Sequence, residues 1–157
     1  MRILGLVTGI VTCIGLVPVF AFDFAAGMKA YEAHDFTRAM REWRPLADAG
    51  DAMAQFNLGL LHYEGQGAPQ DYAEAARWFQ SAADQGYAKA QLNLGALYGS
   101  GKGVKRDYAR AYMWLSLCAA TGDEKCATQR DLVAAKLNAK TLALAQKQAR
   151  EWKPIKK

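Results

Sequence analysis

The pattern of apolar and polar residues in this chain repeats with a period of 36 residues. Residues 54–89 and 90–125 align without a gap and are identical at 16 positions, so they are two copies of one structural unit. A fixed period of this length is typical of solenoids built from stacked helix pairs. The pattern therefore predicts one helix pair per unit.

The first helix of each unit is predicted from its apolar spacing. Ala54, Leu58 and Leu61 follow one another at i, i+4 and i+7, which places them on one helix face. Gly59 lies on the same helix, where glycine costs about 1 kcal/mol relative to alanine. We expect this glycine to allow a neighbouring helix to approach closely.

The second helix of each unit is predicted from its end signals. The segment Gly65-x-Gly67 ends the first helix, because glycine adopts a positive φ without strain. Asp71 is a candidate N-cap for the second helix. Glu74 follows Asp71 at the spacing of a capping box. Trp43, Trp78 and Trp114 recur at core-type positions of the second helices, and packing in the core is a better explanation for them than partner contact.

The same period extends toward both ends of the chain. Asp35 aligns with Asp71, so an earlier and more divergent unit precedes the two clear copies, and residues 124–152 read as a last pair of amphipathic helices that caps the solenoid. The predicted organisation is a signal peptide (1–21), a degenerate tetratricopeptide-like pair (22–53), two repeats (54–89 and 90–125), and capping helices with a basic tail (126–157).

Composition supports a globular chain. Of the 157 residues, 52% are hydrophobic and 22% are charged, which is unlike a disordered protein. The net charge of +5 is mild, and no basic helix face interleaved with aromatic residues indicates nucleic-acid binding. A solvated surface explains the charge better than an anionic partner.

The N-terminal segment has the features of a secretory signal peptide. Arg2 precedes an apolar run that contains no charge until Asp23, and Pro18 with the small residues Val19 and Ala21 favours cleavage after Ala21. The alternative is an uncleaved membrane anchor, since about 20 apolar residues can cross a bilayer. Export predicts a periplasmic location, and the anchor predicts an inner-membrane one.

The repeated motifs resemble Sel-1-like repeats, which are relatives of tetratricopeptide repeats. The resemblance rests on AQxNLGxLY, GxGV, DYxxA, the following Trp and AAxxG, and it covers most of the chain after the signal segment. His62 and Ala68 depart from the usual Tyr and Val of the family. The resemblance implies an all-α, right-handed superhelical solenoid of about four antiparallel helix pairs, whose members mostly act as adaptors or scaffolds that bind proteins or peptides.

Two of the three cysteines bear on stability. Cys118 and Cys126 align with Ala82 and Ala90, at small positions where a second helix meets the next first helix. The spacing resembles the secreted, cysteine-rich branch of the family, in which such a pair links two helices. We therefore predict a Cys118–Cys126 disulfide, and the alternative is two free thiols in the core.

No pattern of catalytic residues stands out. The chain lacks a phosphate-binding glycine loop and a GxSxG motif, and neither His34 nor His62 has the spacing of a metal ligand. The sequence therefore predicts no catalytic residue, no metal and no cofactor.

The predicted binding surface is the concave face of the superhelix, to which the first helices contribute. The side-chain amide of asparagine can hydrogen-bond both the donor and the acceptor of a peptide backbone. Hydrogen bonds from the two aligned asparagines to the backbone between repeats are an equally good explanation. The candidate residues are Gln55, Asn57, His62, Gln91, Asn93 and Tyr98.

These observations favour a non-enzymatic, exported, monomeric adaptor that binds a protein or peptide in the cell envelope. One alternative is a protein or enzyme that binds cell-wall fragments or β-lactams, because some cysteine-rich relatives are associated with β-lactam binding. A second alternative is a membrane-tethered assembly factor with an uncleaved N-terminus.

Overall fold

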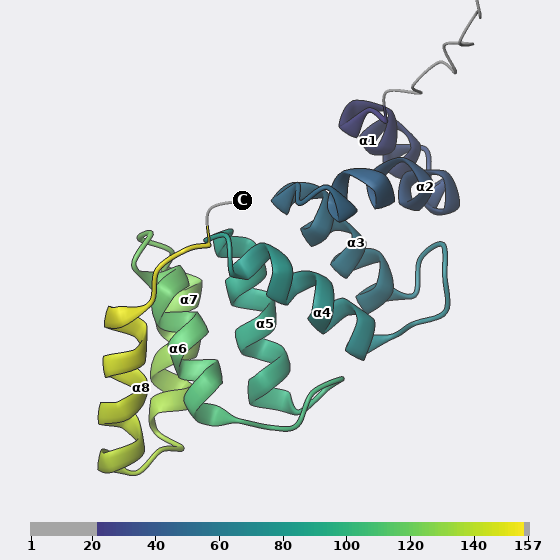
Figure 1. Cartoon of the computed structure of the whole chain (residues 1–157). Helices are drawn as coiled ribbons and strands as arrows, with labels where there is room; N and C mark the ends of the chain where they lie inside the picture. Colours follow the sequence, from purple (N-terminus) through teal and green to yellow (C-terminus); the bar gives the residue numbers. More distant parts are fainter. Residues whose placement is uncertain (1–21, 156–157) are drawn as a thin grey trace, which may run out of the picture.

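The computed structural model of the chain describes residues 22–155, which form eight α-helices and no strand (Figure 1). The predicted signal peptide at residues 1–21 lies outside this range. The all-α prediction is confirmed. The helices are α1 (Phe24–Glu32), α2 (Phe36–Asp48), α3 (Ala52–Glu64), α4 (Tyr72–Ala83), α5 (Ala88–Ser100), α6 (Tyr108–Ala119), α7 (Glu124–Ala134) and α8 (Ala139–Glu151).

Short polar side chains start most of these helices. Every helix except α5 has an N-cap side chain that accepts a hydrogen bond from a backbone N–H of the first turn. This bond satisfies a donor that has no partner within the helix. Gly65 and Gly101 end α3 and α5 in the left-handed conformation, with φ of 71° and 75°. The predicted helix ends therefore follow from local chemistry.

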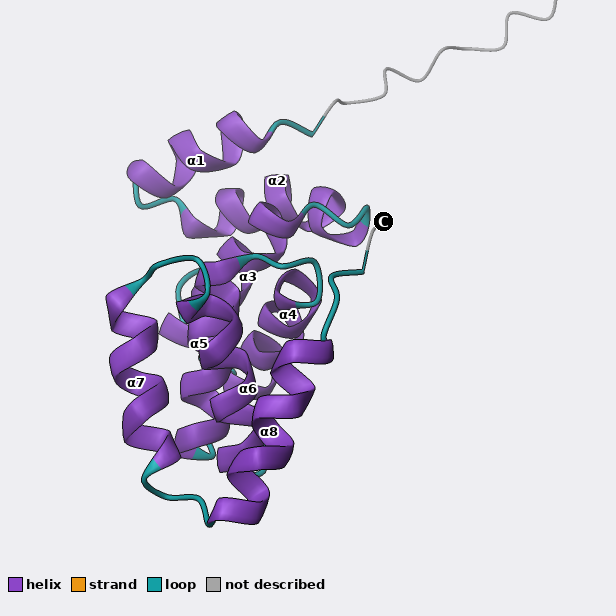
Figure 2. Ribbon diagram, turned by 90° about the vertical axis from the view of Figure 1, so that its left-hand side faces the viewer, coloured by secondary structure: helices purple, strands orange, loops and turns teal. Residues whose placement is uncertain are grey.

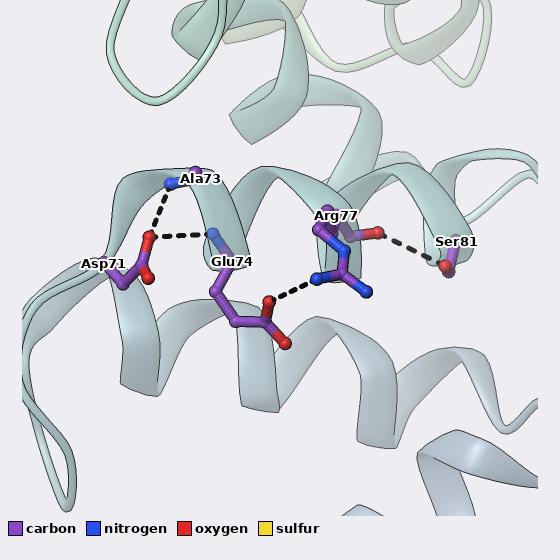
Figure 3. A network of polar contacts seen from close by, with 5 residues as sticks. All are labelled: Asp71, Ala73, Glu74, Arg77 and Ser81. Carbon is purple, nitrogen blue, oxygen red and sulfur yellow. Dashed lines mark hydrogen bonds and ion pairs between the residues drawn. The ribbon is translucent and has the colours of Figure 1, made fainter.

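The capping box predicted at the start of α4 forms only in part. Asp71 accepts from the N–H groups of Ala73 and Glu74, both at 2.9 Å (Figure 3). The Glu74 carboxylate does not return to the Asp71 N–H, which donates to the carbonyl of His62 instead. Glu74 pairs with Arg77 at 3.0 Å. The prediction of a reciprocal Glu74–Asp71 bond was wrong, because the Asp71 N–H already donates to a carbonyl in the last turn of α3.

Consecutive helices pack against each other along the solenoid, so that α1 pairs with α2, α3 with α4, and α5 with α6. Gly59 and Gly95 allow this approach, as predicted. A Cβ on Gly59 would lie 2.5 Å from the Phe79 ring, and one on Gly95 would lie 2.7 Å from Leu115. The buried apolar side chains form two clusters, one around Trp43 and one around Phe79.

The last two helices depart from this pattern. Helices α7 and α8 both pack on α6, on either side of it, and they scarcely contact each other (Figure 2). The residues that follow α8 then turn back, so that Trp152 packs on Trp114 and the Ile155 N–H donates to the Asp84 carbonyl at 2.8 Å. The sequence had predicted a last pair of helices. Both helices are present, but they flank α6 instead of packing together.

In the part of the chain that the structure covers, no helix has the length and apolar character needed to cross a bilayer.

The predicted disulfide is present. Cys118 on α6 is bonded to Cys126 on α7, with the Cα atoms 5.7 Å apart, and both residues are buried. The bond therefore fixes the start of α7 against α6.

Replacing both cysteines by alanine is expected to lower the free energy of unfolding by about 2.5 kcal/mol. The reason is that the bond closes a short loop and so restricts the unfolded chain. Alanine should fit both sites, because the aligned residues Ala82 and Ala90 are fully buried. Urea unfolding of the oxidised protein and the variant measures this difference. A variant that unfolds at the same urea concentration would show that the bond does not contribute to stability.

Candidate functional site

Two of the six candidate residues are internal to the fold. Gln55 is 2% exposed, and its Nε2 donates to the Ala47 carbonyl at 3.0 Å while its Oε1 accepts from Gln85 at 2.8 Å. Gln91 is also 2% exposed and donates to the Ala83 carbonyl at 3.3 Å. Each glutamine thus joins the first helix of a repeat to the second helix of the preceding one. Neither amide is open to a partner, so we remove both from the candidate surface.

The two asparagines lie on a different face of the same helices. Asn57 is half-buried, and its amide nitrogen lies 3.9 Å from the Met28 sulfur on α1. Asn93 is half-buried in a groove of about 390 Å³ between α3 and α5, and its amide makes no hydrogen bond within residues 22–155. The remaining lining residues are Leu60, Tyr63, Glu64, Ala96, Leu97, Ser100 and Lys102.

Tyr98 faces away from that groove. It lines a separate pocket of about 520 Å³ that is formed mainly with α4 and the loop before α6. The Tyr98 hydroxyl accepts a hydrogen bond from Arg110 Nη1 at 3.2 Å, and the guanidinium lies 5.5 Å from the ring centre. This hydrogen bond raises the pKa of Arg110.

His62 occupies the position of α3 that corresponds to Tyr98. Both of its ring nitrogens are buried, and neither has a hydrogen-bond partner in the structure. The six candidate residues therefore do not share one surface. The glutamines tie repeats together, the asparagines lie on the side of the first helices, and Tyr98 lines a pocket beside α4.

A groove that the sequence did not indicate lies between α2 and α4. It measures about 300 Å³ and contains Trp78, whose ring has the Arg44 guanidinium 5.1 Å from its centre. Arg77 and Glu74 form an ion pair along the same helix (Figure 3). Trp43 and Trp114 are 1% and 4% exposed, so the core prediction holds for them. Trp78 is only half-buried, although it shares its repeat position with Trp114. Trp43 aligns instead with the buried Phe79.

One cluster has the residue types of a metal site. Cys118, Asp123 and Cys126 come together at the turn between α6 and α7. Both sulfurs belong to the disulfide, and Asp123 accepts the Cys126 N–H as the N-cap of α7. These atoms therefore act in stabilising the turn.

Comparisons with known proteins agree with this architecture. The Sel1 repeat family matches residues 52–87 and 88–123. A protective antigen of uropathogenic Escherichia coli strains displaying an SLR fold is 32% identical, with a TM-score of 0.76, over 80% of this chain and 28% of that one. A Sel1 repeat protein from Oxalobacter formigenes is 26% identical, with a TM-score of 0.68, over 83% of this chain and 56% of that one.

This chain spans between about a quarter and a little over half of those two structures. A comparison with curated proteins found no match. The two matched repeats coincide with α3–α4 and α5–α6, and the solved relatives share the helical solenoid. The chain therefore contains two Sel1 repeats, at residues 52–87 and 88–123, within a helical solenoid like those of the solved Sel1-repeat structures.

Proposed function

We propose that this protein is an exported, non-enzymatic scaffold that binds an extended segment of a partner protein in the groove between α3 and α5. Sel1-repeat proteins generally mediate contacts between proteins, which supports the broad role. The partner, the groove and the location in the cell envelope are our inference.

The side-chain amide of Asn93 carries the proposal. It lies in the groove with no hydrogen bond inside the described chain, and an asparagine can both donate to and accept from one peptide unit. Leu60 and Tyr63 on α3 supply apolar and aromatic surface beside it. Asn57 is one repeat away on the equivalent face, with a weak sulfur contact in place of a strong bond. This spacing suits a peptide that runs across the first helices.

Two features support export. The first 21 residues have the charge and apolar pattern of a signal peptide, and the Cys118–Cys126 bond suits an oxidising compartment. We therefore place the protein in the periplasm. The intact mass of protein isolated from cells distinguishes a chain cleaved after Ala21 from an anchored one.

The Asn57→Ala, Asn93→Ala double variant tests the groove. We expect this variant to bind at least tenfold more weakly to a partner protein that is captured and crosslinked from an envelope fraction. The reason is that each substitution removes a side-chain amide that would donate to and accept from the backbone of the partner. Its unfolding temperature should stay close to that of the parent, since neither amide makes a strong internal bond.

The matched control is Gln148→Ala, which removes an exposed amide from α8 and should leave partner capture unchanged. Unchanged capture by the double variant would reject this groove. Labelling of the folded protein by a β-lactam probe, with no protein partner captured, would support the cell-wall alternative instead.

A further inference from the structure

The separation of α7 from α8 is explained by two residues of α7 that differ from the residues at the aligned positions of α3 and α5. The fully packed core positions Leu58 and Leu94 correspond to Arg130 on α7. The close-contact glycines Gly59 and Gly95 correspond to Asp131. A charged side chain cannot enter an apolar helix contact without a large desolvation cost, and a carboxylate at the glycine position blocks close approach. Helix α8 therefore packs mainly on α6.

A groove lies between α7 and α8, with α6 as its floor. Figure 2 shows the two helices on either side of α6. Its volume is about 500 Å³. Arg130 lies on one wall and Arg150 on the other, and no carboxylate lines the groove. The other lining residues are Tyr112, Ser116, Leu117, Ala120, Gln146 and Ala149.

The floor of the groove offers polar groups as well as the two arginines. The Ser116 hydroxyl is buried and has no hydrogen-bond partner. The Tyr112 hydroxyl has only a long contact, with Gln146 Nε2 at 3.5 Å. Arg150 makes no ion pair with any residue of 22–155, and Arg130 pairs only with its exposed sequence neighbour Asp131. An exposed pair of this kind exchanges readily for another carboxylate.

The charge of the chain is concentrated at this end. Residues 124–155 contain seven lysines and arginines and three acidic residues, a net charge of +4. Residues 22–123 contain ten basic and twelve acidic residues, a net charge of −2. An acidic partner is therefore attracted to the α7–α8 end and not to the remainder of the solenoid.

We propose that the α7–α8 groove binds an acidic peptide segment of a partner protein. Carboxylates of the segment pair with Arg130 and Arg150, and guanidinium groups are well suited to this because they can bind a carboxylate through two hydrogen bonds. Ser116, Tyr112 and Gln146 bond the part of the peptide that enters the recess. A recessed floor with hydroxyl and amide groups fits a peptide better than it fits the flat surface of a membrane. This site is separate from the groove between α3 and α5.

Titration of the ¹⁵N-labelled full chain with an octapeptide of alternating glutamate and alanine tests the proposal. We expect shifts of the backbone amides that line the groove, and none with the matching glutamine–alanine peptide. The Arg130→Gln, Arg150→Gln variant should bind the acidic peptide at least tenfold more weakly. The parent affinity should fall as salt is added, because the contacts are ionic.

The matched control is Arg38→Gln, Arg41→Gln, which removes the same charge from the exposed side of α2 and should change the affinity less than twofold. Retained affinity in the groove variant, or shifts confined to other helices, would overturn the proposal. So would capture by phosphatidylglycerol vesicles through the same arginines without any peptide binding. The Asn57→Ala, Asn93→Ala variant should bind the acidic peptide normally, so the two proposals can fail independently.

Discussion

Replacing Gly103 by alanine is expected to lower the free energy of unfolding by at least about 3 kcal/mol. Gly103 lies in the loop between α5 and α6 with φ of 68°, in the left-handed region that disfavours side chains. A Cβ at this position would overlap the backbone carbonyl of Tyr72 at the start of α4. Backbone atoms of a helix cannot turn aside as the end of a flexible side chain can, so the two repeats would have to separate. Urea unfolding monitored by helical circular dichroism measures the loss.

Gly122→Ala is the matched control for this prediction. Gly122 has φ of 90°, and no atom lies within 4 Å of its expected Cβ. Its substitution should therefore cost only the conformational penalty, about 1 kcal/mol. Equal losses in the two variants would mean that the contact between the loop and α4 does not contribute to stability.

The second large effect is expected for Trp43→Ala, which should destabilise the α1–α2 pair by about 4 kcal/mol. Trp43 is 1% exposed, and its ring centre lies 5.8 Å from those of Phe24, on which it stacks, and Tyr31, to which it is tilted. Its Nε1 donates to the Phe24 carbonyl at 3.2 Å. Gly27 has no side chain, and a Cβ at that position would overlap the Trp43 indole. The substitution therefore removes most of the contact between the first two helices.

The loss should be confined to one end of the molecule, because each unit of a solenoid contacts only its neighbours. Hydrogen exchange should show fast exchange in α1 and α2 and near-parent protection in α5 and α6. Trp43→Phe keeps an aromatic ring but not the hydrogen bond, and it should be clearly less destabilised. Uniform loss of protection along the whole chain would contradict this local picture.

The helices and their order were predictable because their signals are local. An Asp N-cap, a left-handed glycine and an i, i+4, i+7 apolar spacing each act within one or two turns, so they can be read without knowledge of the fold. Asp71, Gly65 and Leu58 are examples. The Cys118–Cys126 bond was also predictable, because the 36-residue register placed both cysteines at small positions of adjacent helices.

The candidate site was less predictable. Gln55, Asn57 and His62 look alike in a sequence as polar residues on one helix. The structure buries Gln55 against a backbone carbonyl, leaves Asn57 half-buried beside α1, and encloses both nitrogens of His62. Each outcome depends on which neighbouring helix covers that side of α3. The substitution of Leu and Gly by Arg130 and Asp131 was visible in the register, but its effect on α8 was not.

By itself, the sequence determined the repeat, the helices and the covalent link between α6 and α7, since these depend on periodicity, helix ends and register. Only the tertiary structure decided which polar groups remain free and where the grooves between α3 and α5 and between α7 and α8 lie. The physical reason is that a groove exists only where two helices fail to pack. That outcome is set by contacts between residues far apart in the chain, such as those that hold α8 on α6 and keep it off α7.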